Sequence, residues 1–188
     1  MTAIDEKRVD KFVRRAARGD TEAFGSIYEI YADRVYSYIR ARLKDEHDAQ
    51  DVTGTVFVKA FEAIGAYDRR GLPFGAWLFR IARNATVDHV RRAARVPEPY
   101  EDLEAKLPPS DVRIDEQVAA RVDAEAIRVC VHRLTEDQAA VITCRFFFDL
   151  DVKQTARALD KTEGAVKALQ HRAMKNLATM LVEVIDDE

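Results

Sequence analysis

Apolar side chains recur at spacings of three and four residues along most of the 188-residue chain, which predicts α-helices. One helix follows Asp20, a good N-cap, and is expected to bury its regularly spaced side chains: Phe24, Ile27, Tyr28, Tyr31, Val35, Tyr38, Ile39 and Leu43. A second begins near Asp48 and buries an apolar face from Val52 to Ile64 that includes Phe61. A third starts at Phe74 and carries arginines toward its end. Strand patterns are scarce, so the fold is predicted to be all-α.

The helical pattern stops at residues 96–113 and resumes near Ile114. Residues 96–113 are rich in proline and acidic side chains, a composition that cannot form a packed core and predicts an extended acidic linker. We therefore predict two small helical domains, residues 5–95 and 114–184, on either side of this linker.

The second predicted domain contains several shorter helical patterns. Its first two helices are expected to bury Val118, Val122, Ala126 and Val129, and then Ala139, Ile142 and Phe146. Thr135 caps the second of these helices. A short helix at Val152–Leu159 and a long final helix capped by Thr162 are joined by a tight turn at Asp160 and Lys161. The last two helices have the proportions of a helix-turn-helix, which places its second helix in the major groove of DNA.

The composition and motifs argue against a membrane protein and against an enzyme. No apolar run approaches the roughly 18 residues that span a membrane, and the charged N-terminus lacks the apolar core of a signal peptide. Cys130 and Cys144 form no CxxC motif, which favours a reducing, cytoplasmic location and argues against a zinc site. The histidines are scattered, and no catalytic or phosphate-binding motif is present. We expect no membrane insertion, no metal, no cofactor, no small-molecule substrate and no enzymatic activity.

The net charge of −3 hides an uneven distribution. Residues 80–95 contain five arginines and one aspartate, and residues 152–181 contain six basic and two acidic side chains. Between them, residues 98–116 contain seven acidic and two basic side chains. Basic patches attract the phosphate backbone of nucleic acids, although solvated helix faces explain the same charges equally well.

Two stretches carry side chains suited to nucleic acid. The final helix leaves a polar face of Glu163, Lys167, Gln170, His171 and Lys175. Donors and acceptors of these kinds match base edges in the major groove, but any amphipathic helical hairpin has such a face, so a purely structural role stays open. Earlier in the chain, Phe74, Trp77 and Phe79 lie among arginines, which suits unstacked bases and their phosphates. The alternative is that Phe74 and Trp77 belong to the core.

Four stretches resemble, in this order and over nearly the whole chain, the extracytoplasmic-function (ECF) sigma factors of bacterial RNA polymerase: GDTEAFGSIYEIYADRVYSYIRARL, DAQDVTGTVFVKAFEAI, PFGAWLFRIARNATVDHVRR and LTEDQAAVITCRFFFDLDVKQTARALDKTEGAVKALQHRAMKNL. The resemblance implies a sigma region 2 bundle, a linker that runs through the polymerase and a region 4 helix-turn-helix, with no cofactor. The implied function is that of an alternative sigma factor, which directs polymerase to −35 and −10 promoter elements and nucleates DNA melting. Its partners would be core RNA polymerase (β′ clamp and β flap), promoter DNA and a dedicated anti-sigma factor. The alternative is a stand-alone helix-turn-helix regulator.

The resemblance assigns three sets of contact residues. The −10 element would contact Tyr67, Asp68, Arg69, Arg70, Phe74, Trp77, Arg80, Arg83, Asn84, Arg91 and Arg92. Within this set, Asn84 matches the residue next to an unpaired base, and the turn from Tyr67 to Leu72 matches the loop that pockets an extruded base. The −35 element would contact Thr162, Glu163, Lys167, Gln170, His171, Arg172 and Lys175. Core polymerase would contact Asp48, Asp51, Thr55, Phe57 and Lys59.

The chain departs from the family pattern at two places. Asp160 stands where relatives usually carry Gly, and Asp tolerates the left-handed conformation well enough to keep the turn. Gly54 and Thr55 stand where relatives usually carry Gln and an acid, so the stripe that would face polymerase is less acidic than usual. Either the remaining acids and other contacts suffice for binding, or phosphorylation of Thr55 or Thr53 restores the acidic face.

Overall fold

The computed structural model describes residues 4–43, 45–68, 71–93 and 133–186, and every regular element within these ranges is helical. The helices, in chain order, are α1 (Glu6–Ala16), α2 (Thr21–Arg40), α3 (Glu46–Ala63), the 3₁₀ turn η1 (Ile64–Ala66), α4 (Phe74–Ala93), α6 (Glu136–Ile142), the π-helical turn η2 (Thr143–Phe147), α7 (Val152–Leu159) and α8 (Glu163–Asp186). The prediction of an all-α fold is confirmed. The predicted linker and the predicted helix that contains Val118 lie outside the described residues.

Local sequence signals set most of the helix ends. Asp20 caps α2 by accepting a hydrogen bond from the backbone N–H of Ala23 at 2.9 Å, and this bond holds the pKa of Asp20 below its usual range. Thr135 begins α6 in a reciprocal capping box with Gln138. Asp160 adopts the left-handed conformation, with φ at 54°, in the turn between α7 and α8. The predicted caps and the predicted turn are therefore confirmed.

Two helix starts differ from the sequence-based expectation. Helix α3 begins at Glu46 rather than near Asp48, because Asp45 accepts the backbone N–H of Asp48 and acts as the cap. Helix α1 is not predicted as a separate helix, although Asp5 caps it and Val9 lies on its buried face. Helix α1 packs against α2, α4 and η1.

The first four helices enclose a hydrophobic core. Its fully buried large side chains include Val13, Ile27, Val35, Ile39, Val56, Leu78 and Phe79. Tyr28 and Phe61, which are predicted to be buried, are 48% and 44% exposed. Both lie at the margin between α2 and α3, where Tyr28 meets Phe57 edge-on at 4.7 Å and Phe61 meets Phe24 at 5.0 Å between ring centroids. Each ring therefore keeps one side in solvent.

The chain leaves α6 through the π-helical turn η2. The backbone N–H of Phe148 bonds to the carbonyl of Thr143, five residues earlier, at 3.0 Å. A π turn holds more residues than an α turn, so the side chains within it and after it take up a different register from that of an α-helix. For this reason Phe146, which is predicted to be buried, is 51% exposed, whereas Phe148 is 2% exposed in the core.

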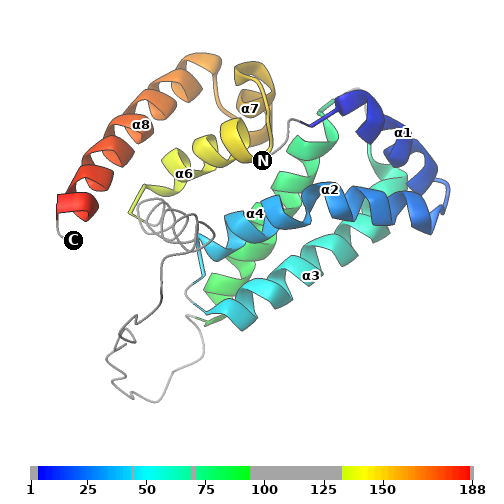
Figure 1. Ribbon diagram of the computed structural model, residues 1–188. Helices are drawn as coiled ribbons and strands as arrows, with labels where there is room; N and C mark the ends of the chain where they lie inside the picture. Colours follow the sequence, from blue (N-terminus) through cyan, green and yellow to red (C-terminus); the bar gives the residue numbers. More distant parts are fainter. Residues whose placement is uncertain (1–3, 44, 69–70, 94–132, 187–188) are drawn as a thin grey trace, which may run out of the picture.

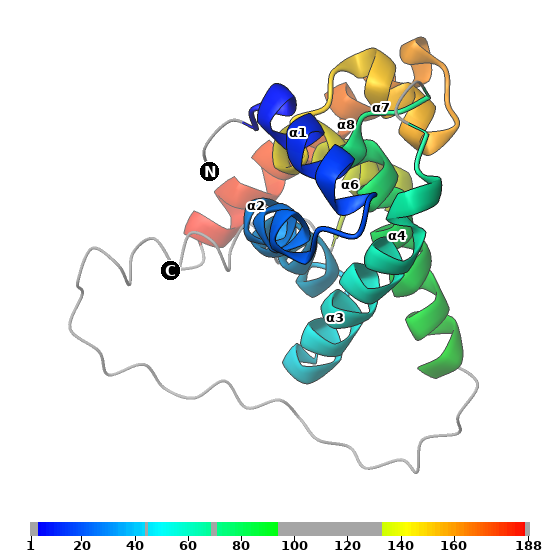
Figure 2. The ribbon, with the colours of Figure 1, turned by 90° about the vertical axis from the view of Figure 1, so that its right-hand side faces the viewer.

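The helices before and after the linker pack on each other and share one core. Figures 1 and 2 show α6, α7 and α8 beside α2 and α4. Phe148 contacts the rings of Tyr31 and Phe79, at centroid distances of 6.1 Å and 5.5 Å. Leu150 and Leu159 of the second group are buried in the same core. We call α1–α4 the first domain and α6–α8 the second domain. Their docking is not predicted by the sequence pattern.

The substitution Gly54→Ala is expected to raise the free energy of unfolding by about 0.4–1 kcal/mol, because Ala lowers the entropy of the unfolded chain and favours the helix. Gly54 is exposed in the middle of α3, and a Cβ atom there would meet no other atom within 4 Å. Urea unfolding followed by circular dichroism measures the change. Gly75→Ala is the matched control, because its Cβ would lie 3.3 Å from the Tyr31 hydroxyl. A loss of stability in Gly54→Ala would show that this glycine is structurally required.

Candidate nucleic-acid interface

The start of α4 and the loop before it form an aromatic cluster. The rings of Tyr67, Phe74 and Trp77 lie 5.1–5.6 Å apart between centroids. The Tyr67 hydroxyl donates a hydrogen bond to the carbonyl of Leu72, which holds the two ends of the loop together. Phe74 is 3% exposed and supports the cluster from within, whereas Tyr67 and Trp77 are partly exposed. The cluster therefore presents two aromatic side chains to a ligand and uses the third for packing.

A cavity of about 490 Å³ opens beside this loop. Its lining includes Tyr67 and Leu72 of the loop, Tyr31 of α2, and Asp149 and Arg157 of the second domain. The loop that is predicted to pocket an extruded base thus borders a cavity lined by both domains. Asp68 is exposed in the loop, and the predicted contacts Arg69 and Arg70 lie outside the described residues.

Helix α4 carries the remaining predicted −10 contacts. Asn84, Arg91 and Arg92 are exposed to solvent, and Arg92 donates from Nε to the carbonyl of Asp88 at 3.2 Å. Arg80 lies one turn before Asn84, and Arg91 two turns after it, so the three side chains fall on one helical face. This face of α4 offers cationic and amide groups along several turns.

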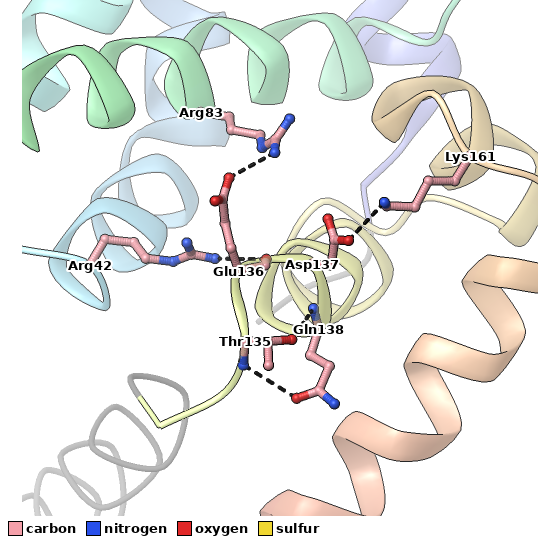
Figure 3. A network of polar contacts seen from close by, with 7 residues as sticks. All are labelled: Arg42, Arg83, Thr135, Glu136, Asp137, Gln138 and Lys161. Carbon is pink, nitrogen blue, oxygen red and sulfur yellow. Dashed lines mark hydrogen bonds and ion pairs between the residues drawn. The ribbon is translucent and has the colours of Figure 1, made fainter. Parts of the chain in front are cut away.

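Arg80 and Arg83 both bind the second domain, although Arg80 stays exposed and Arg83 is only partly buried. Arg80 donates from Nε to the carbonyl of Ala158 at 2.9 Å and also to the carbonyl of Arg157. Arg83 makes an ion pair with Glu136 of α6 at 2.7 Å, and Figure 3 shows the two side chains pointing toward each other. Two of the predicted DNA contacts therefore lie at the boundary between the domains.

Helix α8 presents the predicted −35 contacts. The side chains of Thr162, Glu163, Lys167, His171, Arg172 and Lys175 are exposed. Gln170 is partly buried, and its amide oxygen accepts a hydrogen bond from Arg145 Nε at 3.2 Å. Arg145 also donates to the carbonyl of Leu150, so it links Gln170 of α8 to the segment that precedes α7.

The residues predicted to bind polymerase lie on α3, where most of them form a stripe along one side of the helix. Asp51, Thr55 and Lys59 are exposed, and Asp48, half-exposed, lies 3.2 Å from His89 Nε2 of α4. Phe57 differs from the rest of this set, because it is 5% exposed and packs in the core below the stripe.

The two threonines that are candidates for phosphorylation differ in access. The hydroxyl of Thr53 is buried and donates to the carbonyl of Ala49 at 2.7 Å. The hydroxyl of Thr55 is exposed and donates to the carbonyl of Asp51 at 3.0 Å. Of the two, only the Thr55 side chain is open to an incoming enzyme.

Sequence reasoning missed the polar residues that join the domains, among them Arg34 and Glu136. Arg34 of α2 is 7% exposed, and its guanidinium donates to the carbonyl of Phe147. Glu136 pairs with Arg83 as described. The signal for Arg34 is positional, because it stands on the apolar face of α2, three residues after Tyr31 and four before Tyr38. Glu136 gives no such signal, because an acid in the first turn of a helix is favourable in any helix.

The perturbed titratable groups point to packing instead of catalysis. Burial raises the pKa of Tyr38 to about 12 and also raises the pKa of Tyr31 and of the Cys144 thiol, so all three stay protonated at neutral pH. Within the described ranges, no group of three or more His, Cys, Asp or Glu side chains is placed to hold a metal ion. None of the helices in that part of the chain is long and apolar enough to cross a membrane.

Two protein-family models match the chain. Residues 27–96 match "Sigma-70 region 2", and residues 124–177 match "Sigma-70, region 4". The first match covers α2, α3 and α4, which carry the predicted polymerase-binding stripe and −10 face. The second covers the helix-turn-helix. We therefore use the names region 2 and region 4 for the first and second domains.

Similar proteins extend the likeness over almost the whole chain. The ECF RNA polymerase sigma factor BldN of Streptomyces coelicolor is 37% identical over 182 residues, which cover 94% of this chain and 67% of BldN. The ECF RNA polymerase sigma factor SigW of Bacillus subtilis is 26% identical, with 94% of this chain and 98% of SigW covered. The solved structure of CnrH in complex with the cytosolic domain of CnrY has the same fold, with a TM-score of 0.69, 24% identity and coverage of 95% of this chain and 99% of CnrH. The chain belongs to the ECF sigma factors, the alternative sigma factors that direct bacterial RNA polymerase to promoters.

Proposed function

We propose that three exposed faces divide the work of this sigma factor. The stripe of Asp48, Asp51, Thr55 and Lys59 on α3 binds the β′ clamp of core polymerase. The face of α4 with Asn84, together with the loop from Tyr67 to Leu72, binds and opens the −10 element. The exposed face of α8 reads the −35 element, while region 4 contacts the β flap. The observation that carries this proposal is that α4 and α8, on either side of the linker, each expose cationic side chains, and that α4 also exposes the amide of Asn84.

The aromatic cluster gives the −10 face a means to hold melted DNA. Extruding a base costs a few kcal/mol of stacking, and a pocket with aromatic walls recovers part of this cost. Tyr67 lines the cavity, next to a loop held by the Tyr67–Leu72 hydrogen bond. Trp77 is partly exposed and packs against the Tyr67 ring, with 5.1 Å between the ring centroids. Arginines on the same helix supply the attraction to phosphate. No catalytic step is assigned to this chain, which acts by binding and works in the bacterial cytoplasm with its polymerase.

We also propose an anti-sigma factor as a partner. The solved complex of CnrH with the cytosolic domain of CnrY shows a protein of the same fold bound by a domain of another protein. In this chain, Tyr28, Val58 and Phe61 are exposed apolar side chains on α2 and α3 that a partner can cover.

Run-off transcription with core polymerase and a promoter selected by the wild-type chain tests the three faces separately. One substitution is made in each: Asp51→Ala on α3, Asn84→Ala on α4 and Lys167→Ala on α8. The expected result is loss of core affinity in the first, loss of open complexes in the second and changed −35 preference in the third. If all three variants lose the same step, the division of work among the faces is wrong. If the chain binds duplex DNA but starts no transcription with polymerase, the stand-alone regulator is the better description.

The substitution Thr55→Glu is expected to raise the affinity for core polymerase by about twofold to fivefold at low salt, as an exposed ion pair does. Thr55 is exposed on the stripe, one turn after Asp51, at a position that would add an acid to this face. Fluorescence anisotropy of the labelled chain with core polymerase measures the effect. The gain is expected to shrink as the salt concentration rises, because ions screen surface charges. Thr55→Gln is the uncharged control, and an equal gain in that variant would exclude a charge effect.

Two substitutions on α8 are expected to affect DNA binding differently, one through sequence preference and the other through overall affinity. Lys167→Ala is expected to change the preference at one or two −35 positions by about 1–3 kcal/mol per lost base contact. Arg172→Ala is expected to weaken binding to all sequences alike and to reduce the salt dependence, because it holds phosphate. Both side chains are exposed on the helix that follows the turn at Asp160. Selection of −35 sequences from a random pool measures both effects, and an unchanged profile in Lys167→Ala would remove Lys167 from base readout.

A further inference from the structure

Helix α1 carries a row of basic side chains that none of the three proposed faces includes. Four exposed cations follow one another at spacings of four, three and four residues, which places them on one side of the helix and of the turn after it: Lys7, Lys11, Arg14 and Arg18. We call these four residues the α1 stripe. The opposite side of α1 is buried in the core of region 2 through Val9 and Val13. The stripe lies outside residues 27–96 and 124–177, which match the family models.

The stability of α1 does not account for this stripe. Side chains three and four residues apart on a helix are neighbours, so like charges at these spacings destabilise the helix. Lys7 stands in the first turn, where the helix dipole disfavours a cation. Among the described residues, no ion pair involves Lys7, Lys11 or Arg18. The stripe is therefore a concentration of positive charge that suits an external anion.

The other two arginines of α1 differ from the stripe, because both have partners within region 2. Arg15 makes an ion pair with Asp20 at 2.7 Å. The guanidinium of Arg8 lies over the ring of Phe12, 5.6 Å from its centroid. These two cations contribute to the fold, which leaves the stripe as the part of the α1 charge that faces solvent.

The α1 stripe lies next to the loop that is proposed to capture an extruded base. Helix α1 packs against η1, which precedes the loop, and against α4, which follows it (Figure 1). Glu6, Lys7 and Asp10 line the same cavity of about 490 Å³ as Tyr67 and Leu72 of the loop. A DNA strand that leaves the loop on this side therefore runs along α1.

The path of the chain indicates which part of the promoter this is. Helix α4 ends at Ala93, and the chain continues from there to region 4, which is proposed to read the −35 element. The end of α4 therefore faces the upstream side of the −10 element, and the loop before α4 faces the downstream side. From Lys7 to Arg14 the stripe extends about 10 Å at 1.5 Å per residue, which corresponds to about three nucleotides of one strand.

We propose that the α1 stripe binds the phosphates of the promoter strand immediately downstream of the −10 element, on the strand whose base the loop captures. This inference rests on the proposed function of the loop. Lys and Arg side chains neutralise phosphates, and such contacts position a strand without reading its bases. An anionic membrane surface fits less well, because the apolar side of α1, which a membrane-bound helix inserts between lipids, is buried in the core.

Two double variants and two DNA templates test this contact in the complex of core polymerase with the full-length chain. Lys7→Gln with Lys11→Gln removes two charges at exposed positions, and Lys7→Arg with Lys11→Arg keeps them. Both templates carry a promoter selected by the wild-type chain, with a single-stranded −10 element. In the long template the captured strand extends about five nucleotides beyond the −10 element, enough to span the stripe, and in the short template it ends there. Anisotropy of a fluorescein label on the DNA measures the affinity.

The glutamine variant is expected to bind the long template about twofold to tenfold more weakly than the wild-type chain, as the loss of two exposed charge contacts does. The slope of log affinity against log salt is expected to become less steep by about 1.4, because each phosphate neutralised on a single strand contributes about 0.7. On the short template the glutamine variant and the wild-type chain are expected to bind equally. The arginine variant is expected to match the wild-type chain on both templates.

Several results would overturn the proposal. Equal weakening of the glutamine variant on both templates would trace the effect to net charge instead of to the downstream strand. Weakening of the arginine variant to the same extent would show that the two lysines serve the fold. Unchanged binding of the glutamine variant to the long template would exclude a phosphate contact. If that variant also no longer sediments with phosphatidylglycerol vesicles that the wild-type chain binds, the stripe belongs to a membrane surface.

Failure of the proposed function is a separate outcome of the same assay. The short template keeps the −10 element and lacks the strand assigned to the stripe. If Asn84→Ala binds this template as tightly as the wild-type chain does, the proposed −10 face is wrong. A loss in Asn84→Ala on the short template, with no effect of the glutamine variant on the long one, would reject only the α1 contact.

Discussion

Replacing Phe79 by alanine is expected to lower the free energy of unfolding by about 3–5 kcal/mol, the usual cost of removing a fully buried aromatic ring. Phe79 is 0% exposed on α4, and its ring meets Tyr38 of α2 at 5.0 Å and Phe148 of region 4 at 5.5 Å. The substitution removes a contact inside region 2 and a contact between the regions at once. Chemical unfolding monitored by circular dichroism measures the loss.

Phe146→Ala provides the matched control for this experiment. Phe146 is also a phenylalanine, but it is 51% exposed within the π-helical turn η2. Its replacement is expected to change the free energy of unfolding by less than about 0.5 kcal/mol, because surface substitutions seldom do more. Equal losses at Phe146 and Phe79 would contradict the register that η2 imposes.

Replacing Asn84 by alanine is expected to make the free energy of open-complex formation less favourable by about 1–3 kcal/mol, the value of a lost base contact. The affinity for core polymerase is expected to stay unchanged. At 1.4 kcal/mol for each factor of ten, this corresponds to roughly 5- to 150-fold fewer open complexes. Asn84 is exposed on α4, one turn after Arg80, so its loss leaves the core of region 2 intact. Permanganate footprinting of the melted −10 region measures the effect.

Two controls separate a base contact from a structural defect. A promoter with a pre-melted −10 region is expected to restore part of the activity of Asn84→Ala, because the cost of melting is removed. Asp88→Ala, one turn further along the exposed side of α4, is expected to leave open complexes unchanged. If Asn84→Ala lowers core affinity as much as promoter opening, Asn84 is a structural residue.

The helices of this chain follow from local rules, and so they are predictable from sequence. Thr135 caps α6, and Asp160 ends α7 in the left-handed conformation, because the chemistry of each end depends on side chains a few residues away. The exposure of Phe146 was not predictable from an α-helical period, because η2 departs from that period. The spacing of apolar residues therefore predicts where the helices lie, but it does not predict which side chains are buried in a π turn.

The docking of the two regions depends on contacts that no local rule describes. Arg34 and its acceptor at Phe147 lie 113 residues apart in the chain, and Arg80 and Ala158 lie 78 residues apart. From the sequence, Arg80 is interpreted as a phosphate-binding side chain, and the position of Arg34 on the apolar face of α2 indicates burial without identifying its partner. The contact residues proposed for DNA and polymerase came from the family resemblance, and their exposure on α3, α4 and α8 is what the structure adds.

The docking bonds have a further consequence for how this protein can change during evolution. Arg34, Arg42 and Arg80 bind carbonyl oxygens of the region 4 main chain, which every amino acid supplies. Substitutions that give α8 a new promoter preference leave these acceptors in place as long as the helices keep their ends. Region 4 is therefore free to diversify, or to be exchanged between related sigma factors, without a matching change in region 2. A chimaera that carries a foreign region 4 would keep the main-chain part of this docking, whereas the part made by the side chains of Glu136 and Phe148 would depend on the residues that replace them.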